Sequence, residues 1–332
     1  MLRGHSLVCF ISVVLLLCLN LLMVSSVAPQ LLPRQIIAWI LGIILFFIGR
    51  LIDPKNIGSA RHIIFAVSCL LLLLPILFNG FVRGSRRWLD IGPLSLQPSE
   101  ITKPWILLSL VNSSHFALIL VPTIITLAQP DLGSAISIFF LSIPMIIYHP
   151  KFIRFLIIGT ISFMIFSPLL WNFGLKEYQR HRILTFLSPE LDPLGLGYNV
   201  IQSKIAIGSG GFFGKGYRKG TQGQLLFLPE KHTDFMFAAT VEERGIIGAA
   251  ILLLCYFGLI GSLFSKAFVS TNNRPLFLFT LGIAFQIWLL TFVNIGMNLG
   301  LLPVTGIPLP FLSVGGSSII SLLFSLGIVF SS

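Results

Sequence analysis

The chain has few charged residues, and this scarcity excludes an ordinary soluble domain. Of its 332 residues, 10% are Asp, Glu, Lys or Arg and 55% are hydrophobic, with a mean hydropathy of +0.95. Soluble globular domains contain about 25% charged residues. The few charges that are present also gather in a small number of loops. The composition therefore predicts an all-helical, polytopic integral membrane protein, for which we expect no nucleic-acid partner.

Paired cysteines and the common phosphate-binding motifs are missing too. Cys9, Cys18, Cys69 and Cys255 lie within apolar runs without metal-ligand spacing, so neither a disulfide framework nor a metal site is predicted. The glycine-rich stretch 207–220 fits neither the P-loop nor the dinucleotide pattern, which argues against a soluble nucleotide-binding fold. We find no internal repeat, so the sequence gives no support to an inverted-repeat transporter.

Ten apolar segments are present instead, and each predicts a helix that crosses the membrane. They cover residues of about 7–26, 35–52, 62–80, 99–112, 115–128, 132–148, 152–172, 236–264, 275–296 and 314–331. The first is too long for a signal peptide, so we interpret it as an uncleaved helix. Lys and Arg are more frequent in the short loops on the N-terminal side, which predicts a cytoplasmic N-terminus.

The prediction is thus a single membrane domain, residues 1–332. It has a long outer loop at about 173–235 and a re-entrant or outer loop, rich in proline and glycine, at about 297–316. Two outer segments, 83–103 and the long loop, are basic against the usual trend. Such charge indicates an anionic ligand, although a solvated loop that meets anionic lipid explains it equally well.

The densest cluster of ionisable groups lies in FLPEKHTDFMF, residues 227–237. Asp234 comes just before the eighth apolar segment, where it is either a helix cap or a general base at the membrane surface. Thr233 is an alternative cap. Glu242 lies about two turns further into the same helix, where an ionisable group is costly and therefore functional or paired.

A second cluster lies in QPSEITK, residues 97–103, which predicts a helix start. Glu100 and Lys103 share one face of that helix, as an ion pair or as part of a ligand site. Trp88 is either an interfacial anchor or a surface on which a sugar ring stacks. Asp131, beside a proline break, is interpreted as structural.

Five motifs follow one another in the sequence. They are RRWLDIGPLSLQPSEITK, AQPDLGSAI, DPLGLGYNVIQSKIAIGSGGFFGKG, FLPEKHTDFMFA and NIGMNLGLLPVTGIPLPFLSVGGSS. Together they resemble the SEDS family (shape, elongation, division and sporulation), the integral-membrane peptidoglycan glycosyltransferases, over most of the chain. Their residues are more similar to those of the rod-shape branch of the family than to those of the division branch.

The resemblance implies a ten-helix protein of the cytoplasmic (inner) membrane. It implies polymerisation of lipid II at the outer face, in cell elongation and cell-shape maintenance, with a class B penicillin-binding protein as partner. It places the essential aspartate of the family at Asp234, and three further motif residues at Trp88, Glu100 and Lys103. The sequence departs from the family at Arg244, at Val314 and in its short length, which puts partner contacts in doubt more than the chemistry.

Lipid II polymerisation calls for one inverting transfer of a hexosyl group, with a base on the acceptor hydroxyl and positive charge on the leaving diphosphate. Asp234 is the predicted base. The predicted cations are Arg87, Lys103, Lys204 and Lys231. Glu242 is a further candidate for substrate binding. No metal ligands are predicted; Mg²⁺ or Mn²⁺ is compatible with the reaction but is not required by the sequence.

Three alternatives stay open from the residues. A lipid II flippase predicts movement of the precursor without polymer. A scaffold for a transpeptidase predicts that loss of Asp234 is tolerated. A polymerase of the division branch predicts the same chemistry in a different cellular process.

Overall fold

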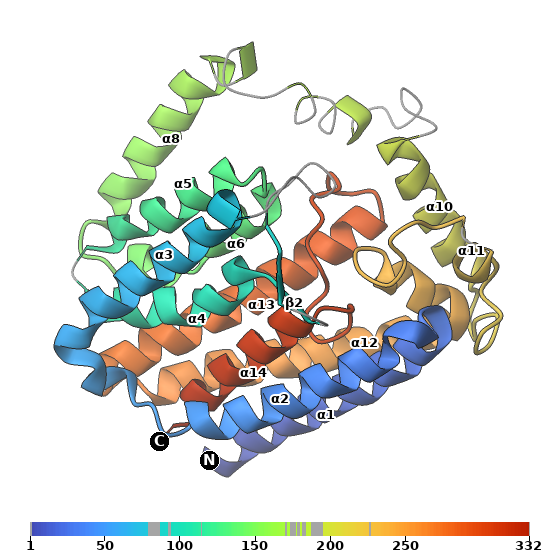
Figure 1. The fold of residues 1–332 in the computed structure, drawn as a ribbon, viewed down its shortest axis with the longest axis horizontal. Coiled ribbons are helices and arrows are strands. Elements are labelled where there is room, and N and C mark those ends of the chain that lie inside the picture. The colour runs from blue at the N-terminus through green and yellow to red at the C-terminus, as the bar shows by residue number, and fades with distance from the viewer. Residues whose placement is uncertain are drawn as a thin grey trace.

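The computed structural model describes residues 2–78, 87–91, 94–113, 115–169, 171–172, 177, 180, 184–186, 195–225 and 227–331. The chain folds into a bundle of helices (Figure 1). The α-helices are α1 (Leu2–Val27), α2 (Leu32–Gly49), α3 (Arg61–Phe78), α4 (Pro98–Val111), α5 (Leu120–Ala128), α6 (Leu132–Phe140), α7 (Ile143–Ile147), α8 (Phe152–Leu169), α10 (Leu196–Ser209), α11 (Thr221–Gln224), α12 (Met236–Val269), α13 (Arg274–Asn298) and α14 (Gly316–Val329).

Short elements connect these helices. They are the 3-10 helices η1 (Pro29–Leu31), η2 (Pro54–Ala60) and η3 (Phe116–Ile119), and the strands β1 (Leu89–Ile91) and β2 (Leu94–Leu96). The two strands pair antiparallel, with Leu89 opposite Leu96. This small hairpin leads directly into α4, whose first residues line the site described below.

Each of the ten predicted segments is helical over most of its described residues. Six of the described helices are long and apolar enough to cross a membrane, namely α1, α2, α3, α8, α12 and α13. The other segments form shorter helices, of which α4 and α14 are buried along nearly their whole length. The predicted helix at 132–148 is divided into α6 and α7, because Pro144 in the first turn of α7 cannot donate a backbone hydrogen bond.

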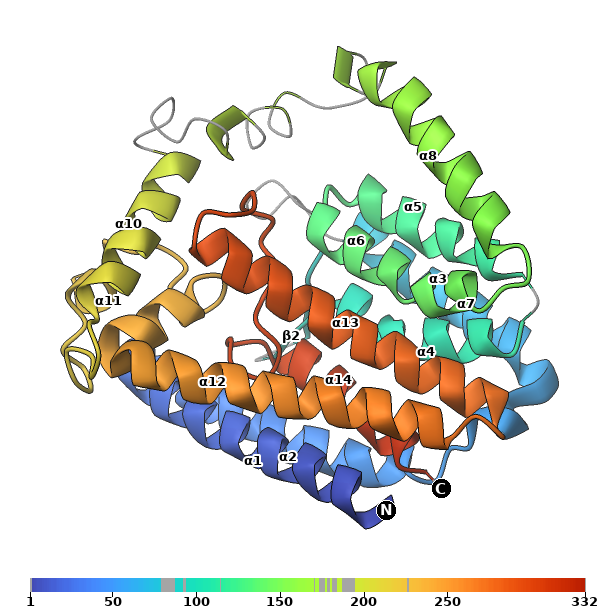
Figure 2. The same ribbon diagram turned by 180° about the vertical axis from the view of Figure 1, so that it is seen from behind.

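The bundle has a tightly packed side and an open side. In both views α1 lies along α12 and α2 lies along α14, whereas α8 leans away from the other helices (Figures 1 and 2). The chain ends lie close together at one end of the bundle (Figures 1 and 2). Small residues allow the close approach of α2 to α14, since a Cβ on Gly327 would lie 2.1 Å from the backbone oxygen of Phe46.

α12 is kinked near its first third, at Gly245, where φ is +67° and ψ is −165°. The segment 211–216 fills the gap in the helical hydrogen bonds. Lys215 N donates to the backbone oxygen of Glu242 at 2.9 Å, and Ile246 N donates to the backbone oxygen of Gly211, also at 2.9 Å. A broken helix at membrane depth requires such local partners, and this loop supplies them.

The segment predicted as a long outer loop, at about 173–235, contains helices in its described part. That part contains α10, which packs on α12, and the short helix α11. Residues 173–176, 178–179, 181–183, 187–194 and 226 lie outside the described residues. The predicted loop at about 297–316 is non-helical from residue 299 to 315, and Gly300 and Gly306 both have φ of +71°.

Candidate functional site

A cavity of about 560 Å³ lies where α4, α6, α12 and α14 begin. These segments are distant in sequence, and the loop at 306–308 and residues 87–88 complete the wall. Charged and hydroxyl side chains are concentrated in the lining, although the chain as a whole is apolar. A concave site with convergent polar groups is the usual form of a binding or catalytic site.

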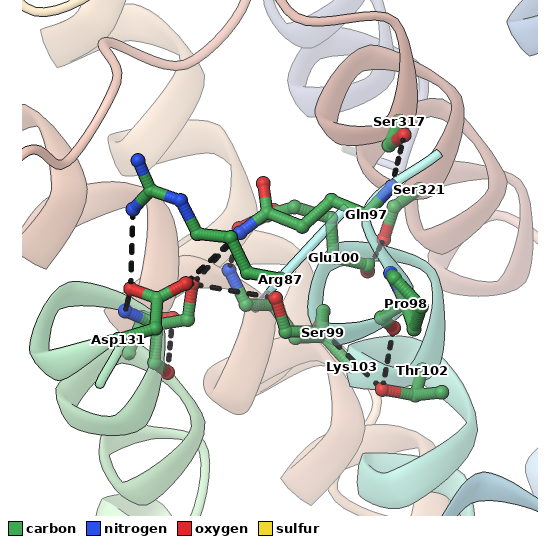
Figure 3. A network of polar contacts seen from close by, with 12 residues as sticks. Arg87, Gln97, Pro98, Ser99, Glu100, Thr102, Lys103, Asp131, Ser317 and Ser321 are labelled. Atoms are coloured by element: carbon green, nitrogen blue, oxygen red, sulfur yellow. Dashed lines mark hydrogen bonds and ion pairs between the residues drawn. The ribbon is translucent and has the colours of Figure 1, made fainter. Parts of the chain in front are cut away.

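A buried ion pair forms one wall of the cavity. Lys103 Nζ lies 2.5 Å from Glu100 Oε1, one turn away on α4, and the two residues are only 1% and 5% exposed. The backbone oxygen of Glu100 accepts a hydrogen bond from Ser321 Oγ at 2.7 Å, which ties α4 to α14 (Figure 3). Two charges at this depth are stable only as a pair.

Arg87 and Asp131 form a second charged contact, between the segment that precedes β1 and the N-cap of α6. Arg87 Nη1 lies 3.6 Å from Asp131 Oδ1 (Figure 3). The Asp131 carboxylate also accepts a hydrogen bond from Ser134 N at 3.1 Å, which caps α6, and one from Gln97 Nε2 at 3.1 Å. These contacts agree with the interpretation of Asp131 as structural, since it fixes the start of α6 and orients Arg87.

Asp234 lines the cavity immediately before α12. The N-cap residue of α12 is Phe235, so neither Asp234 nor Thr233 takes that place. The carboxylate lies beside Gly306, where an added Cβ would be 3.6 Å from Asp234 Oδ2. The position of Asp234 therefore favours a role toward the cavity over a role as the cap of its own helix.

Two asparagines of α13 hold the backbone of Asp234. The side-chain amides of Asn294 and Asn298 both donate to the Asp234 backbone oxygen, at 2.9 and 3.0 Å. Asn298 Oδ1 also accepts from Ala238 N at 3.1 Å, and so caps the first turn of α12 from a neighbouring helix. Asn294 Nδ2 further donates to Ile307 O at 2.8 Å, so the same side chain also holds the loop at 306–308 that lines the cavity.

The segment before α14 is tied to the segment before α12. Ser313 Oγ donates to Thr233 O at 2.5 Å, and Val314 N donates to His232 O at 2.9 Å. These bonds place the beginning of α14 next to the residues that precede Asp234. The proline- and glycine-rich loop predicted at about 297–316 thus lines the cavity and contributes shape and hydrogen bonds without charge.

Five of the eight predicted site residues line the cavity: Trp88, Arg87, Glu100, Lys103 and Asp234. The other three, Lys204, Lys231 and Glu242, do not line it. Lys204 is exposed on α10, where its Cε covers Gly300. The structure therefore places Lys204 at the contact between α10 and the loop after α13, and not at the predicted diphosphate site.

Lys231 and Glu242 serve the loop between α10 and α12. Lys231 Nζ donates to Gly223 O, and partial burial lowers the pKa of this ammonium, an effect that the nearby Glu243 charge opposes. The carboxylate of Glu242, fully buried, accepts from Lys215 Nζ at 2.8 Å, from Thr221 Oγ1 at 3.1 Å, and from two backbone N–H groups. Its surroundings assign Glu242 to fastening this loop, not to the cavity.

Glu242→Gln is expected to lower the free energy of unfolding by about 2–3 kcal/mol, because the buried carboxylate accepts several hydrogen bonds and pairs with Lys215. Unfolding in detergent, followed against temperature or denaturant, measures the change. The exposed Glu177→Gln is the control and should leave stability unchanged. A Glu242→Gln protein that is as stable as the wild type but inactive would support the predicted role of Glu242 in substrate binding.

The two residues that depart from the family pattern lie in different places. Arg244 stacks on the ring of Tyr217, with 5.8 Å from the guanidinium carbon to the ring centroid. Val314 lines the cavity. The Val314 departure therefore lies in the wall of the same cavity as Asp234, and the effect of both departures on partner contacts stays a prediction.

Sequence reasoning missed the uncharged residues of the site, chiefly Asn294, Asn298, Ser317 and Ser318. A signal for the asparagines was present: two amides spaced by four residues on one face of an apolar helix require partners. The serines gave no comparable signal, because serine is common and only the convergence of helix ends makes these two important.

Known proteins match this chain along almost its whole length. The family model FTSW_RODA_SPOVE, described as a cell cycle protein, matches residues 2–331. The peptidoglycan glycosyltransferase MrdB of Escherichia coli K12 is 37% identical over 335 residues, which cover 95% of this chain and 90% of that protein. MrdB of Helicobacter pylori is 36% identical over 340 residues, covering 96% of this chain and 87% of that protein.

Solved structures share the fold. A chain from "Structural coordination of polymerization and crosslinking by a peptidoglycan synthase complex" is 33% identical with a TM-score of 0.82, covering 97% of this chain and 95% of that chain. The rod shape determining protein RodA of Thermus thermophilus is 29% identical with a TM-score of 0.68, covering 97% and 94%. The chain therefore belongs to the FtsW, RodA and SpoVE family of cell cycle proteins, the SEDS family that its motifs resemble.

Proposed function

We propose that this protein is a peptidoglycan glycosyltransferase that polymerises lipid II into glycan strands at the outer face of the cytoplasmic membrane, during cell elongation. The observation that carries the proposal is the cavity, which unites Asp234 with Lys103 and Arg87. A base and two cations are the groups that this transfer needs. Support also comes from relatives named peptidoglycan glycosyltransferase MrdB, and from a chain solved in a peptidoglycan synthase complex.

The reaction forms one bond and breaks one bond at the same carbon. The 4-hydroxyl oxygen of the acceptor sugar attacks the anomeric carbon, and the electron pair of the carbon–oxygen bond leaves with the lipid diphosphate. The donor linkage is alpha and the product linkage is beta, so a single inverting displacement suffices. No carboxylate nucleophile is required, in contrast to a retaining glycosidase.

In the proposed mechanism Asp234 accepts the proton of the attacking hydroxyl. Lys103 and Arg87 stabilise the negative charge that develops on the diphosphate. Trp88 offers a flat apolar surface at the same cavity for a sugar ring. The buried contact of Lys103 with Glu100 and the contact of the half-buried Arg87 with Asp131 keep both cations in place before the substrate arrives, so little reorganisation is needed.

A divalent cation fits this proposal as a companion of the diphosphate. The described residues contain no preformed group of three or more His, Cys, Asp or Glu side chains that could hold a metal. The carboxylates that line the cavity are those of Glu100, Glu230 and Asp234. Mg²⁺ or Mn²⁺ would therefore be held largely by phosphate oxygens and water, with one of these carboxylates, and would supply additional positive charge.

A class B penicillin-binding protein is the proposed partner, because peptidoglycan synthesis needs crosslinking of the new strands. The similar chain in a complex that coordinates polymerization and crosslinking supports this pairing. The test of the proposed function combines the purified protein with lipid II and the cognate penicillin-binding protein, whose own chemistry is blocked. Glycan strands are the expected product. Movement of lipid II across a vesicle membrane without strands would identify a flippase instead.

Asn298→Asp is expected to reduce the turnover number about 10²-fold with little change in the KM for lipid II. The variant keeps the oxygen that caps α12 but loses the amide that donates to the Asp234 backbone, so the base shifts while the substrate still binds. Initial rates over a range of lipid II concentrations separate the two parameters.

Asn112→Asp is the matched control for this positioning role. The Asn112 amide also donates to two backbone oxygens, of Pro54 and Leu108, but it lies at the other end of α4 from the cavity. Equal losses of rate in the two variants would assign the Asn298 effect to general stability and not to the position of Asp234.

A further inference from the structure

Four helices begin at the wall of the cavity. α4, α6, α12 and α14 all contribute residues from, or next to, their first turns. The first backbone N–H groups of a helix have no partners within it, and they carry the positive end of the helix dipole. A ligand in the cavity therefore meets the positive ends of four helices. These four ends differ in how many of their N–H groups are already used.

Three of these helix ends have their first N–H groups partly used or absent. Asp131 caps α6 by accepting from Ser134 N at 3.1 Å. Asn298 accepts from Ala238 N at 3.1 Å in the first turn of α12. α4 begins with Pro98, whose ring nitrogen has no hydrogen to donate.

The start of α14 has no such partner. Its N-cap residue is Gly315, and no side chain caps this end. The first bond of the helix runs from Ile319 N to Gly315 O, at 3.1 Å. The N–H groups of residues 316–318 therefore lack acceptors within the helix. Gly315, Ser317 and Ser318 all line the cavity.

Ser318 adds a hydroxyl group that has no hydrogen-bond partner among the described residues, although the residue is only 9% exposed. Its neighbours on α14 are paired: Ser317 Oγ accepts from Gln97 N at 3.0 Å, and Ser321 Oγ donates to Glu100 O (Figure 3). Ser318 Oγ is not one of the solvent-excluded atoms without a partner, so this oxygen is open to the cavity that Ser318 lines. An unpaired hydroxyl on a cavity wall indicates a donor that a ligand completes.

Two cations lie near this helix end, each in contact with a carboxylate of the protein, Lys103 with Glu100 and Arg87 with Asp131. The bond from Ser321 to Glu100 places the first turns of α14 next to the Glu100–Lys103 pair. Arg87 lines the same cavity, and its Nε has no hydrogen-bond partner among the described residues. Uncapped N–H groups beside a lysine and an arginine form the kind of site that recognises phosphate groups.

We propose that the N-terminus of α14, at residues 316–318, binds the diphosphate of the lipid-linked substrate. This assignment deepens the proposed function and rests on it, because the transfer releases a lipid diphosphate. The three backbone N–H groups and the Ser318 hydroxyl donate to phosphate oxygens, and Lys103 supplies charge. Negative charge on the diphosphate increases as the sugar–oxygen bond breaks, so these donors bind the transition state more strongly than the substrate.

The test measures binding of undecaprenyl diphosphate to the full-length protein in zwitterionic nanodiscs, with the neutral undecaprenol as comparison. The variants are Ser318→Ala, Ser318→Asp and, as control, Ser325→Ala. Ser325 lies two turns further along the same helix, outside the cavity lining, and its hydroxyl donates to Ser321 O. Ser318→Asp is informative because a carboxylate in the first turn favours the helix but repels phosphate.

We expect the wild type to bind the diphosphate and not the alcohol. Ser318→Ala should weaken binding about 10-fold and Ser318→Asp about 100-fold or more, which is the range for hydrogen bonds to charged groups. The melting temperature of Ser318→Asp should equal or exceed that of the wild type, and Ser325→Ala should bind normally. Inorganic pyrophosphate should displace the lipid diphosphate, whereas phosphatidylglycerol should not.

Binding to Ser318→Asp at wild-type strength would overturn the assignment, as would displacement by phosphatidylglycerol, which would identify a site for membrane phospholipid. Polymerisation assays on the same samples separate this inference from the proposed function. A wild type that makes no strands but binds the diphosphate at residues 316–318 would contradict only the proposal that the protein is a glycosyltransferase. A Ser318→Asp protein that makes strands at the normal rate would contradict only the assignment to α14.

Discussion

Asp234→Asn is expected to reduce glycan-strand formation from lipid II by about 10²–10⁴-fold, which is the usual contribution of a general base. The amide has nearly the same shape as the carboxylate, but it does not accept the proton of the attacking hydroxyl. In the absence of that acceptor, the hydroxyl must attack the anomeric carbon as a neutral group. The remaining rate would come from orientation and from the cations of the cavity.

Folding should survive this substitution. Asp234 is not the N-cap residue of α12, and the bonds from Asn294 and Asn298 reach its backbone oxygen, which the variant keeps. Initial rates of polymerisation with the blocked penicillin-binding protein give the measurement, together with a melting curve for each sample. Asp53→Asn is the matched control, because Asp53 caps η2 through Lys55 N, outside the cavity, and Asn also serves as a cap.

Two results would contradict the role of Asp234. Wild-type rates in folded Asp234→Asn would remove it as the base. A loss of activity in Asp53→Asn as large as that in Asp234→Asn would show that the assay responds to any change of carboxylate, and the difference between the two sites would then carry no information about proton transfer.

Much of the fold was predictable because the membrane imposes strong rules on composition. A chain that must satisfy every backbone group inside lipid forms helices, and the ten apolar segments predicted the described α-helices other than α10 and α11. α10 was missed because it lies inside a basic, glycine-punctuated stretch without a long apolar run. The kink at Gly245 was missed because its stability depends on the distant segment 211–216, which no local pattern reports.

The site was predictable where charge is scarce and costly. Glu100, Lys103 and Asp234 stood out for this reason, and all three line the cavity. The same reasoning misplaced Glu242, because a buried carboxylate that fastens a loop and one that serves a substrate have the same sequence signature. Only the identity of the donors around the carboxylate separates the two cases, and three-dimensional structure is needed to see them.

The uncharged part of the site was beyond sequence reasoning for a different reason. Its chemistry comes from backbone groups, from the positive ends of helices and from amides of α13 that reach into another helix. These features arise when segments distant in the sequence meet, 60 residues apart for Asn298 and Ala238 and 220 for Gln97 and Ser317. The glycines and serines near residue 315 form no recognisable sequence motif. Their role becomes visible only in the structure, where they form an uncapped helix end.

Lys103→Met is expected to lower the free energy of unfolding by about 3–5 kcal/mol, since it leaves the Glu100 carboxylate buried without its cation. The double variant Glu100→Gln with Lys103→Met removes both charges and should recover most of that stability. It should not recover polymerisation, because the cation that stabilises the leaving diphosphate is still absent. The expected loss of rate is about 10²–10³-fold, in a protein that folds.

Denaturant unfolding in detergent and strand formation from lipid II separate the effect on stability from the effect on rate. Both are measured on the wild type, the single variant, the double variant and a control. The exposed Lys55→Met is the control for removal of a lysine and should change neither property. Normal stability of the single variant would mean that water or another group replaces Lys103 beside Glu100. A double variant that polymerises lipid II at the wild-type rate would show that Lys103 contributes to stability and not to catalysis. Arg87 and the first turn of α14 would then have to stabilise the diphosphate without it.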